Sequence, residues 1–320
     1  SKWQRVRDFV LRHNLILMLI LVVVIATAMT GGKYLRPRNL AVVLSTASIL
    51  GIIALGEGLV FISGGLDLSV GSILTVALAL VARFSTGLGI GIWPATILAV
   101  LAAAALGAAN GLLVSRVKLP PFIATLGMLY IAQSLAWILI SGGRLIQVTA
   151  YKEILQPIFA WLPFGANAFP ILTFAAMLLF VGFLLHRTRF GRYIYVVGGN
   201  DAAARAAGVP VKRVQFLVYM LAGLLCGIAA VVFLYRNISA SPAEGSRYLL
   251  QAVGAVMVGG VYMYGGEGTV PGILIGIIIL SSISSVLTMA GVPPVAHEAV
   301  LGAIVLLVVL VQRAAKARKL

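Results

Sequence analysis

Long apolar stretches recur from one end of this 320-residue sequence to the other, and they restrict the possible fold more than any other feature. A helix rises about 1.5 Å per residue, so about 20 apolar residues cross the ~30 Å hydrocarbon core of a membrane. We therefore expect an all-α polytopic membrane protein embedded in the lipid bilayer, with residues 1–320 forming a single transmembrane domain. Stretches of this kind predict ten spanning helices, some of them broken or re-entrant, near residues 14–31, 40–62, 69–87, 93–114, 121–140, 168–186, 214–235, 248–264, 270–289 and 296–312.

The charged residues support the same class and give an orientation. Only 10% of the residues are charged and 61% are apolar, and the net charge is +16. The basic residues gather in short clusters between apolar stretches, which is typical of membrane topology, so nucleic acid is not an expected partner. An even number of spans puts both termini on one side. Sixteen of the 24 Lys and Arg residues fall in segments on that side, which predicts cytoplasmic termini. We expect the first stretch to remain as a span, because no signal-peptide cleavage pattern follows it.

The sequence contains none of the residue patterns on which an enzyme would depend. The only cysteine, Cys226, lies in an apolar stretch, and the three histidines are scattered, so neither a disulfide nor a metal site is expected. There is no GxxxxGK[ST] motif, no catalytic triad and no paired-carboxylate site. We therefore expect no catalytic residue and no cofactor bound by this chain.

Two connecting segments are long. We expect residues 141–167 on the outside of the membrane and residues 187–213 in the cytoplasm. The outer segment spaces apolar residues like one face of a short helix lying on the membrane, which indicates either simple anchoring or a docking ledge for an external partner. These apolar residues are Ile154, Leu155, Ile158, Phe159 and Trp161.

The stretch "GGNDAAARAAG" at 198–208 interrupts the apolar sequence with alanine, glycine and charge. Asn200 is a good helix cap, Asp201 and Arg205 have the i,i+4 spacing of an ion pair, and Gly208 ends the helix. A helix this short is marginal in water. Its alanines bury little surface but permit a close approach, so the stretch predicts a small helix that an external partner holds.

Polar residues inside the expected spans are the candidates for a transport path. Glu57 is the clearest, because a carboxyl group in a span is costly and is more often functional than structural. Two glycine clusters, "SGGLDLSVGS" (63–72) and "YGGEGTVPG" (264–272), follow a similar pattern and indicate either re-entrant helices or ordinary capped turns. The candidates for the path or its gate are Glu57, Asp67, Ser69, Asn110, Gln251 and Glu267.

Three segments together resemble the permease subunits of bacterial monosaccharide ABC importers of the ribose, xylose and galactofuranose type. They are "GLVFISGGLDLSVGSIL" (58–74), "RTRFGRYIYVVGGNDAAARAAGVPVKRVQFLVYMLAG" (187–223) and "LLQAVGAVMVGGVYMYGGEGTVPGILIG" (249–276). The similarity runs over residues 40–312.

This resemblance implies a multi-pass subunit of the bacterial inner membrane that works as a homodimer or paralogous heterodimer with a second permease. It also implies separate ATPase subunits, which bind ATP and magnesium, and a periplasmic sugar-binding protein. The short alanine helix would then be a coupling helix that fits a groove on the ATPase. The coupling residues would be Gly198, Gly199, Asn200, Asp201, Ala203, Arg205, Ala206 and Gly208. Two other classes compete with this interpretation: a secondary transporter driven by protons through Glu57 and Asp67, and a purely structural membrane scaffold.

Overall fold

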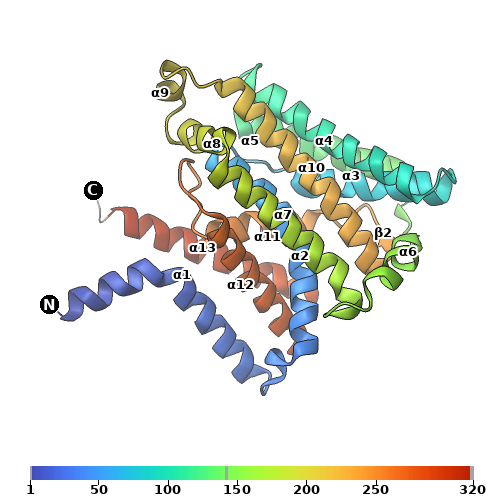
Figure 1. Ribbon diagram of the computed structural model, residues 1–320, viewed down its shortest axis with the longest axis horizontal. Helices are drawn as coiled ribbons and strands as arrows, with labels where there is room; N and C mark the ends of the chain where they lie inside the picture. Colours follow the sequence, from blue (N-terminus) through green and yellow to red (C-terminus); the bar gives the residue numbers. More distant parts are fainter. Residues whose placement is uncertain (1, 141–142, 318–320) are drawn as a thin grey trace.

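The computed structural model describes residues 2–140 and 143–317, and nearly all of its regular structure is helical (Figure 1). This agrees with the all-α class expected from the sequence. The elements, in chain order, are α1 (Lys2–Met29), η1 (Lys33–Leu35), α2 (Pro37–Ile62), α3 (Val70–Ala82), η2 (Arg83–Gly87), α4 (Ile92–Ser115), α5 (Pro121–Leu139), β1 (Ile146–Gln147), α6 (Ala150–Phe159), η4 (Gly165–Asn167), α7 (Ala168–Arg187), α8 (Arg189–Gly199), α9 (Asp201–Ala206), α10 (Val211–Asn237), β2 (Ser239–Ala240), α11 (Ser246–Val258), α12 (Val270–Met289) and α13 (Pro294–Ala317).

Seven of the ten expected spans coincide with helices that are long and apolar enough to cross a membrane, as far as the described residues go. Two others coincide with the shorter apolar stretches Leu15–Met29 of α1 and Ala296–Leu307 of α13. The remaining one, expected at 248–264, is the 13-residue helix α11, which ends at Val258 because a glycine-rich turn follows it. A helix of that length covers only about 20 Å.

The helices differ in how much of their surface the chain itself covers. The most apolar window of α2 is 72% buried, whereas the corresponding windows of α4, α5 and α7 are each 28% buried. The exposed side chains of these three helices are large and apolar, for example Leu101, Ile131 and Leu179. Apolar side chains on an outer face are what lipid requires. The interior of the fold therefore lies around α2, α3 and α10, and α4, α5 and α7 face the bilayer.

Helices α4 and α10 cross at unusually close range, and glycines make this possible. A Cβ atom on Gly107 would lie 3.0 Å from the Cα atom of Gly223 and would collide with the carbonyl oxygen of Tyr219. One turn further along each helix, Gly111 faces the backbone of Phe216 and Gly227 faces the backbone of Val100. Small residues at four-residue spacing are typical of close helix packing in membranes.

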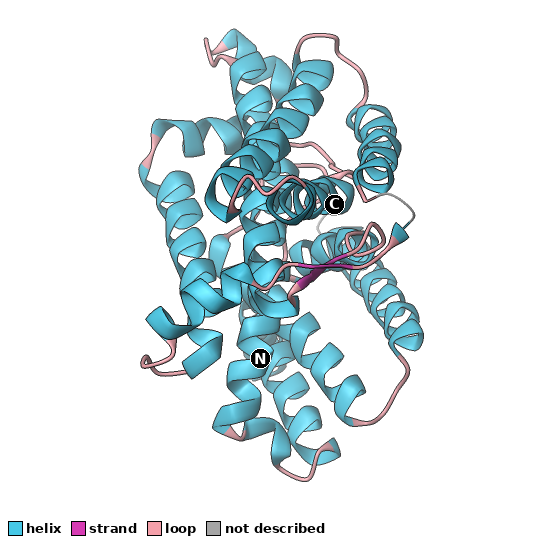
Figure 2. Cartoon of the chain, turned by 90° about the vertical axis from the view of Figure 1, so that its right-hand side faces the viewer, coloured by secondary structure: helices cyan, strands magenta, loops and turns pink. Residues whose placement is uncertain are grey.

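The two long connections contain regular structure that the sequence analysis did not predict. The segment 187–213 was expected to be a loop with one small helix, but it also contains the 11-residue helix α8, whose Ile194 and Val197 are buried. The segment 141–167 contains β1, which pairs antiparallel with β2 through Ile146–Ala240 and Gln147–Ser239 (Figure 2). Segments 87–92, 143–168 and 237–240 lie at one end of the molecule, and α8 and α9 lie at the other (Figure 1).

Candidate functional site

The first glycine cluster forms a break between α2 and α3, and the chain buries most of this break, although Gly64 is exposed. Residues 63–69 connect the end of α2 at Ile62 to the start of α3 at Val70. They form turns and contain no helix. The hydroxyl of Tyr219 on α10 donates to the carbonyl oxygen of Leu66 at 3.3 Å, and Thr125 on α5 donates to the same oxygen at 3.4 Å. The break is therefore held from two sides by hydrogen bonds to its backbone.

Four of the six expected path residues meet at this break and form one buried polar cluster: Glu57, Asp67, Ser69 and Asn110. All four are fully buried. The Oε1 atom of Glu57 accepts from the backbone nitrogen of Asp67 at 3.2 Å. The Oδ1 atom of Asp67 accepts from the backbone nitrogen and the hydroxyl of Ser69. Asn110 Nδ2 donates to Ser69 Oγ at 2.8 Å and reaches Asp67 Oδ1 at 3.5 Å. The cluster thus joins α2, the break and α4.

Three oxygens of the buried polar cluster have no hydrogen-bond partner: Glu57 Oε2, Asp67 Oδ2 and Asn110 Oδ1. Within the described part of the chain, neither carboxyl group forms an ion pair. A buried carboxylate without a cation carries a large desolvation cost. The cluster therefore places buried carboxyl groups with unused hydrogen-bonding capacity beside the break between α2 and α3.

The other two path candidates lie elsewhere. Gln251 is a half-buried residue of α11, and Glu267 is exposed in the second glycine-rich segment, where its carbonyl oxygen accepts from the backbone nitrogen of Tyr262 at 3.0 Å. The structure therefore brings together the polar residues of the first break but not those of the second. Among the described residues, no three His, Cys, Asp or Glu side chains lie together in a way that could hold a metal ion.

Three glycine pairs from distant parts of the sequence meet at one end of the fold, and we call them the glycine junction: Gly64–Gly65, Gly198–Gly199 and Gly265–Gly266. A Cβ atom on Gly198 would collide with the carbonyl oxygen of Ile62 and would lie 2.7 Å from the nitrogen of Gly266. A Cβ atom on Gly265 would lie 2.7 Å from the Cα atom of Gly64. The nitrogen of Gly266 also donates to the carbonyl oxygen of Ile62 at 2.9 Å. The end of α8 is thus in backbone contact with both helix breaks.

Directly after this junction, the small helix α9 has the local structure that the sequence predicts. The side chain of Asn200 accepts from the nitrogen of Ala203 at 2.9 Å and caps the helix. Arg205 donates to both carboxylate oxygens of Asp201, and these hydrogen bonds together with the charge of Asp201 raise the pKa of Arg205. Gly208 ends the helix in the left-handed conformation, with φ of 78°.

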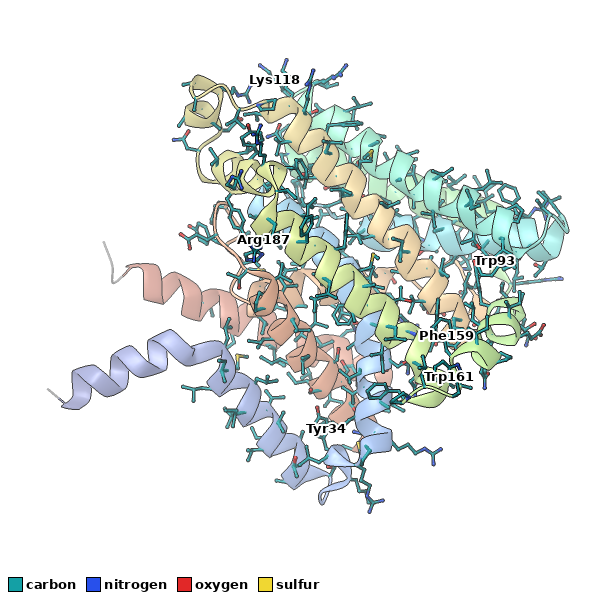
Figure 3. The ribbon with its side chains drawn as sticks, in the orientation of Figure 1. Tyr34, Trp93, Lys118, Phe159, Trp161 and Arg187 are labelled. Carbon is teal, nitrogen blue, oxygen red and sulfur yellow. The ribbon has the colours of Figure 1, made fainter. Side chains whose placement is uncertain are left out.

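The alanines of α9 leave most of its surface free. Ala204 is buried, whereas the other alanines of the segment, Ala202, Ala203, Ala206 and Ala207, are exposed. Beside the helix lies a groove of about 510 Å³, which we call the inner groove, lined among others by Ser63, Lys118 and Arg205. Figure 3 shows Lys118 at the same end of the molecule as α9. A small helix with a smooth, exposed side and an adjoining groove is a suitable contact surface for another protein.

The opposite end carries the amphipathic helix α6, whose apolar residues lie on one side of the helix as expected, and the chain covers this side in part. Leu155 is buried and Phe159 packs on Phe169 of α7, with ring centroids 5.4 Å apart, whereas Ile154, Ile158 and Trp161 are exposed. The chain therefore covers the inward part of this apolar side and leaves the rest of it exposed. The inward side is completed by Tyr151, which contacts Thr96 and the ring of Trp93 on α4.

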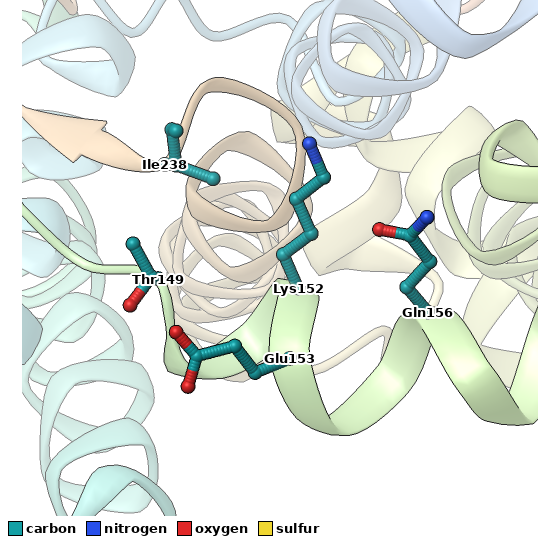
Figure 4. A pocket seen from close by; sticks show the side chains of 5 residues that line it. All are labelled: Thr149, Lys152, Glu153, Gln156 and Ile238. Atoms are coloured by element: carbon teal, nitrogen blue, oxygen red, sulfur yellow. The ribbon is translucent and has the colours of Figure 1, made fainter.

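The charged side of α6 borders a shallow pocket of about 250 Å³ (Figure 4). It is lined by Thr149, Lys152, Glu153, Gln156 and Ile238. The side chains of Lys152 and Glu153 come from adjacent positions of the same helix, so the pocket presents both signs of charge at this end of the molecule.

Comparison with known proteins gives a consistent family. A family model described as "Branched-chain amino acid transport system / permease component" matches residues 39–309. The ribose import permease protein RbsC of Escherichia coli (strain K12) is 34% identical over 304 residues, which are 94% of this chain and 92% of the relative. The ribose import permease protein RbsC of Bacillus subtilis (strain 168) is 35% identical over 297 residues, 91% and 90% of the two chains.

A relative named for a different sugar matches almost as well. The fructose import permease protein FrcC of Rhizobium meliloti is 30% identical over 302 residues, 93% of this chain and 84% of the relative. No solved structure matches the chain.

Proposed function

This chain belongs to the family of permease components described for branched-chain amino acid transport systems, and from that premise we propose that it forms the translocation path of an ATP-driven importer for a monosaccharide or a related small polyol. It is a multi-pass membrane permease of a bacterial ABC importer and is not itself the catalytic subunit. We propose a sugar as the solute because relatives named for ribose and fructose import align with almost the whole chain.

The end of the molecule with α9 is the proposed docking site for an ATPase subunit, which would bind ATP and magnesium. A helix of six residues is too short to be stable alone, yet its exposed alanines have no partner within the described chain. Docking against an ATPase groove would cover them. The proposed contact residues are Gly198, Gly199, Asn200, Asp201, Ala203, Arg205, Ala206 and Gly208. This assignment makes the α9 end cytoplasmic, in agreement with the distribution of Lys and Arg.

The glycine junction is the proposed route by which ATPase movement reaches the path. Gly198 contacts the backbone at Ile62 and Gly266, so a displacement of α8 acts on both helix breaks at once. The buried polar cluster includes residues of the first break. We propose that its four residues act as a gate: Glu57, Asp67, Ser69 and Asn110. Gln251 and Glu267 extend the path along α11 and the second break. A second permease, identical or paralogous, would complete the path.

The opposite end, which carries α6, is the proposed docking site for a periplasmic sugar-binding protein. Helix α6 is fixed on α4 and α7 by aromatic contacts, while its charged residues Lys152 and Glu153 point to the outer pocket. A rigid helix with exposed charges of both signs suits recognition of a soluble partner, because complementary charge steers docking.

The test of ATPase docking uses Ala203→Trp and Ala206→Trp. Both alanines are exposed, so the larger side chain does not disturb the fold of the permease but obstructs a close contact from outside. We expect both variants to insert normally and to retain less than a tenth of the ATPase on co-purification from membranes. Leu101→Trp, on the lipid-facing side of α4, is the matched control and should retain the ATPase. Normal assembly of both alanine variants would disprove the assignment of α9 as the docking element.

A further inference from the structure

Residues 241–247, which connect β2 to the first turn of α11, carry charge into the interior of the membrane domain. After β2 the chain runs inward rather than along the surface. Gln133 on α5 donates to the carbonyl oxygen of Pro242 at 2.6 Å. Three residues further, the nitrogen of Gly245 donates to Thr75 Oγ1 on α3 at 3.1 Å. A Cβ atom on Gly245 would collide with the carbonyl oxygen of Gly71, so the two backbones are in direct contact.

These contacts give the depth of the segment. Gln133 lies six residues before Leu139, the last residue of α5, which is about 9 Å along the helix. Thr75 lies twelve residues before Gly87, the last residue of η2, which is about 18 Å along α3 and η2. Residues 242–245 therefore lie beside the interior turns of two spanning helices and well below their outer ends.

Helix α11 begins at this depth. Its first turns and the residues just before it expose polar groups. We call Glu244, Ser246, Arg247 and Gln251 the α11 polar face. Arg247 pairs with Glu244, and their side chains are 50% and 20% exposed. Ser246 is exposed and Gln251 is half-buried. The neighbouring residues Tyr248 and Ala252 point inward and are buried.

Lipid does not account for an ion pair at this depth. A charged residue inside the bilayer is costly, and such residues almost always face a water-filled cavity or the interior of the bundle. The lipid-facing sides of α4 and α5 expose Leu101 and Ile131 instead. Apart from Leu250, the exposed residues of α11 are polar, in contrast to the faces that meet hydrocarbon.

We propose that the α11 polar face lines the water-filled path through which the solute crosses the membrane. This inference rests on the proposed transport function. It adds Glu244, Ser246 and Arg247 to the path, and it places the path on the α11 side of the first helix break. Carboxylate, guanidinium, hydroxyl and amide groups are the hydrogen-bonding partners that a polyhydroxylated, uncharged solute can exchange for water.

The test is the reactivity of single cysteines in the assembled importer, reconstituted in liposomes with its ATPase subunits. Cys226 is the only cysteine in the sequence and is buried, so Cys226→Ser provides the background. Ser246→Cys probes the α11 polar face, and Leu250→Cys, one turn further and 66% exposed, is a second probe in case the first does not fold. The controls are Leu101→Cys, which faces lipid, and Ala252→Cys, which is buried on the same helix. The reagent is a charged, membrane-impermeant methanethiosulfonate, which reacts with thiols in water.

We expect Ser246→Cys or Leu250→Cys to react at least tenfold faster than both controls. Equal, slow reaction of all four cysteines would overturn the inference, and so would an oxidative cross-link between the cysteines of two permease copies, because the face would then be packed in the permease interface. ATPase co-purification with the Cys226→Ser parent tests the proposed function separately. If the ATPase assembles but the probes do not react, only the location of the path is wrong.

Discussion

Asn110 shows how much a single side chain contributes to the first helix break. Its amide nitrogen reaches Ser69 Oγ and Asp67 Oδ1, and so it connects α4 to the residues that begin α3. Both acceptors are buried, and the carboxyl group of Asp67 already has one oxygen without a partner. The loss of the Asn110 donor would leave further buried polar capacity unsatisfied, which costs more than the hydrogen bond itself contributes.

We expect Asn110→Ala to destabilise the permease by about 1–3 kcal/mol, because the donor to Ser69 and Asp67 is removed without water to replace it. The measurement is thermal unfolding of the purified permease in detergent. Asn237→Ala, at the exposed end of α10, is the control and should shift the transition little. A transition for Asn110→Ala equal to that of the control would show that the cluster contributes nothing to holding the break.

At the scale of elements, apolar length predicted most of the membrane helices but not their interruptions. The stretches at 40–62 and 121–140 became α2 and α5, because about 20 apolar residues have few stable alternatives to a span. The stretch at 248–264 is also apolar, yet α11 ends at Val258, since Gly260 and the following glycines adopt left-handed turns. Apolar content alone does not predict that a connecting segment turns back into the membrane domain. The sequence therefore did not predict that residues 241–245 lie beside the interior turns of α3 and α5.

The crossing of α4 and α10 leads to a prediction about a single methyl group. Gly107→Ala adds a Cβ atom that collides with the carbonyl oxygen of Tyr219 and presses on the backbone of Gly223, so the two helices have to separate. We expect a destabilisation of about 1–3 kcal/mol, as for other overpacked sites. Gly127→Ala on α5 is the matched control, because its Cβ would meet no atom within 4 Å and alanine favours the helix. Thermal unfolding of both variants decides the question, and equal transitions would contradict the role given to Gly107.

At the scale of the whole molecule, contacts between distant segments were the part that the sequence did not predict. The similarity between the clusters at 63–72 and 264–272 was visible in the residues, and so was the unusual "GGN" before α9. The mutual contact of all three was not visible, because glycines leave no pattern of burial or charge from which partners can be inferred. Likewise, Glu57, Asp67, Ser69 and Asn110 were each recognised as polar residues in apolar surroundings, but their meeting depends on how α4 crosses the first break.

The glycine junction gives a prediction for the molecule as a whole, because it joins the α9 end to both helix breaks. Gly198→Ala introduces a Cβ atom into the space between Ile62 and Gly266, so α8 has to move away from the breaks. We expect the variant to unfold at a lower temperature than Gly199→Ala, whose Cβ would meet no atom within 4 Å. In liposomes that contain the ATPase and the binding protein, Gly198→Ala should also lose at least tenfold of the stimulated ATP hydrolysis, whereas Gly127→Ala should keep it. If Gly198→Ala is as stable as Gly199→Ala and is stimulated normally, α8 does not transmit movement through this contact, and the two ends of the permease communicate by another route.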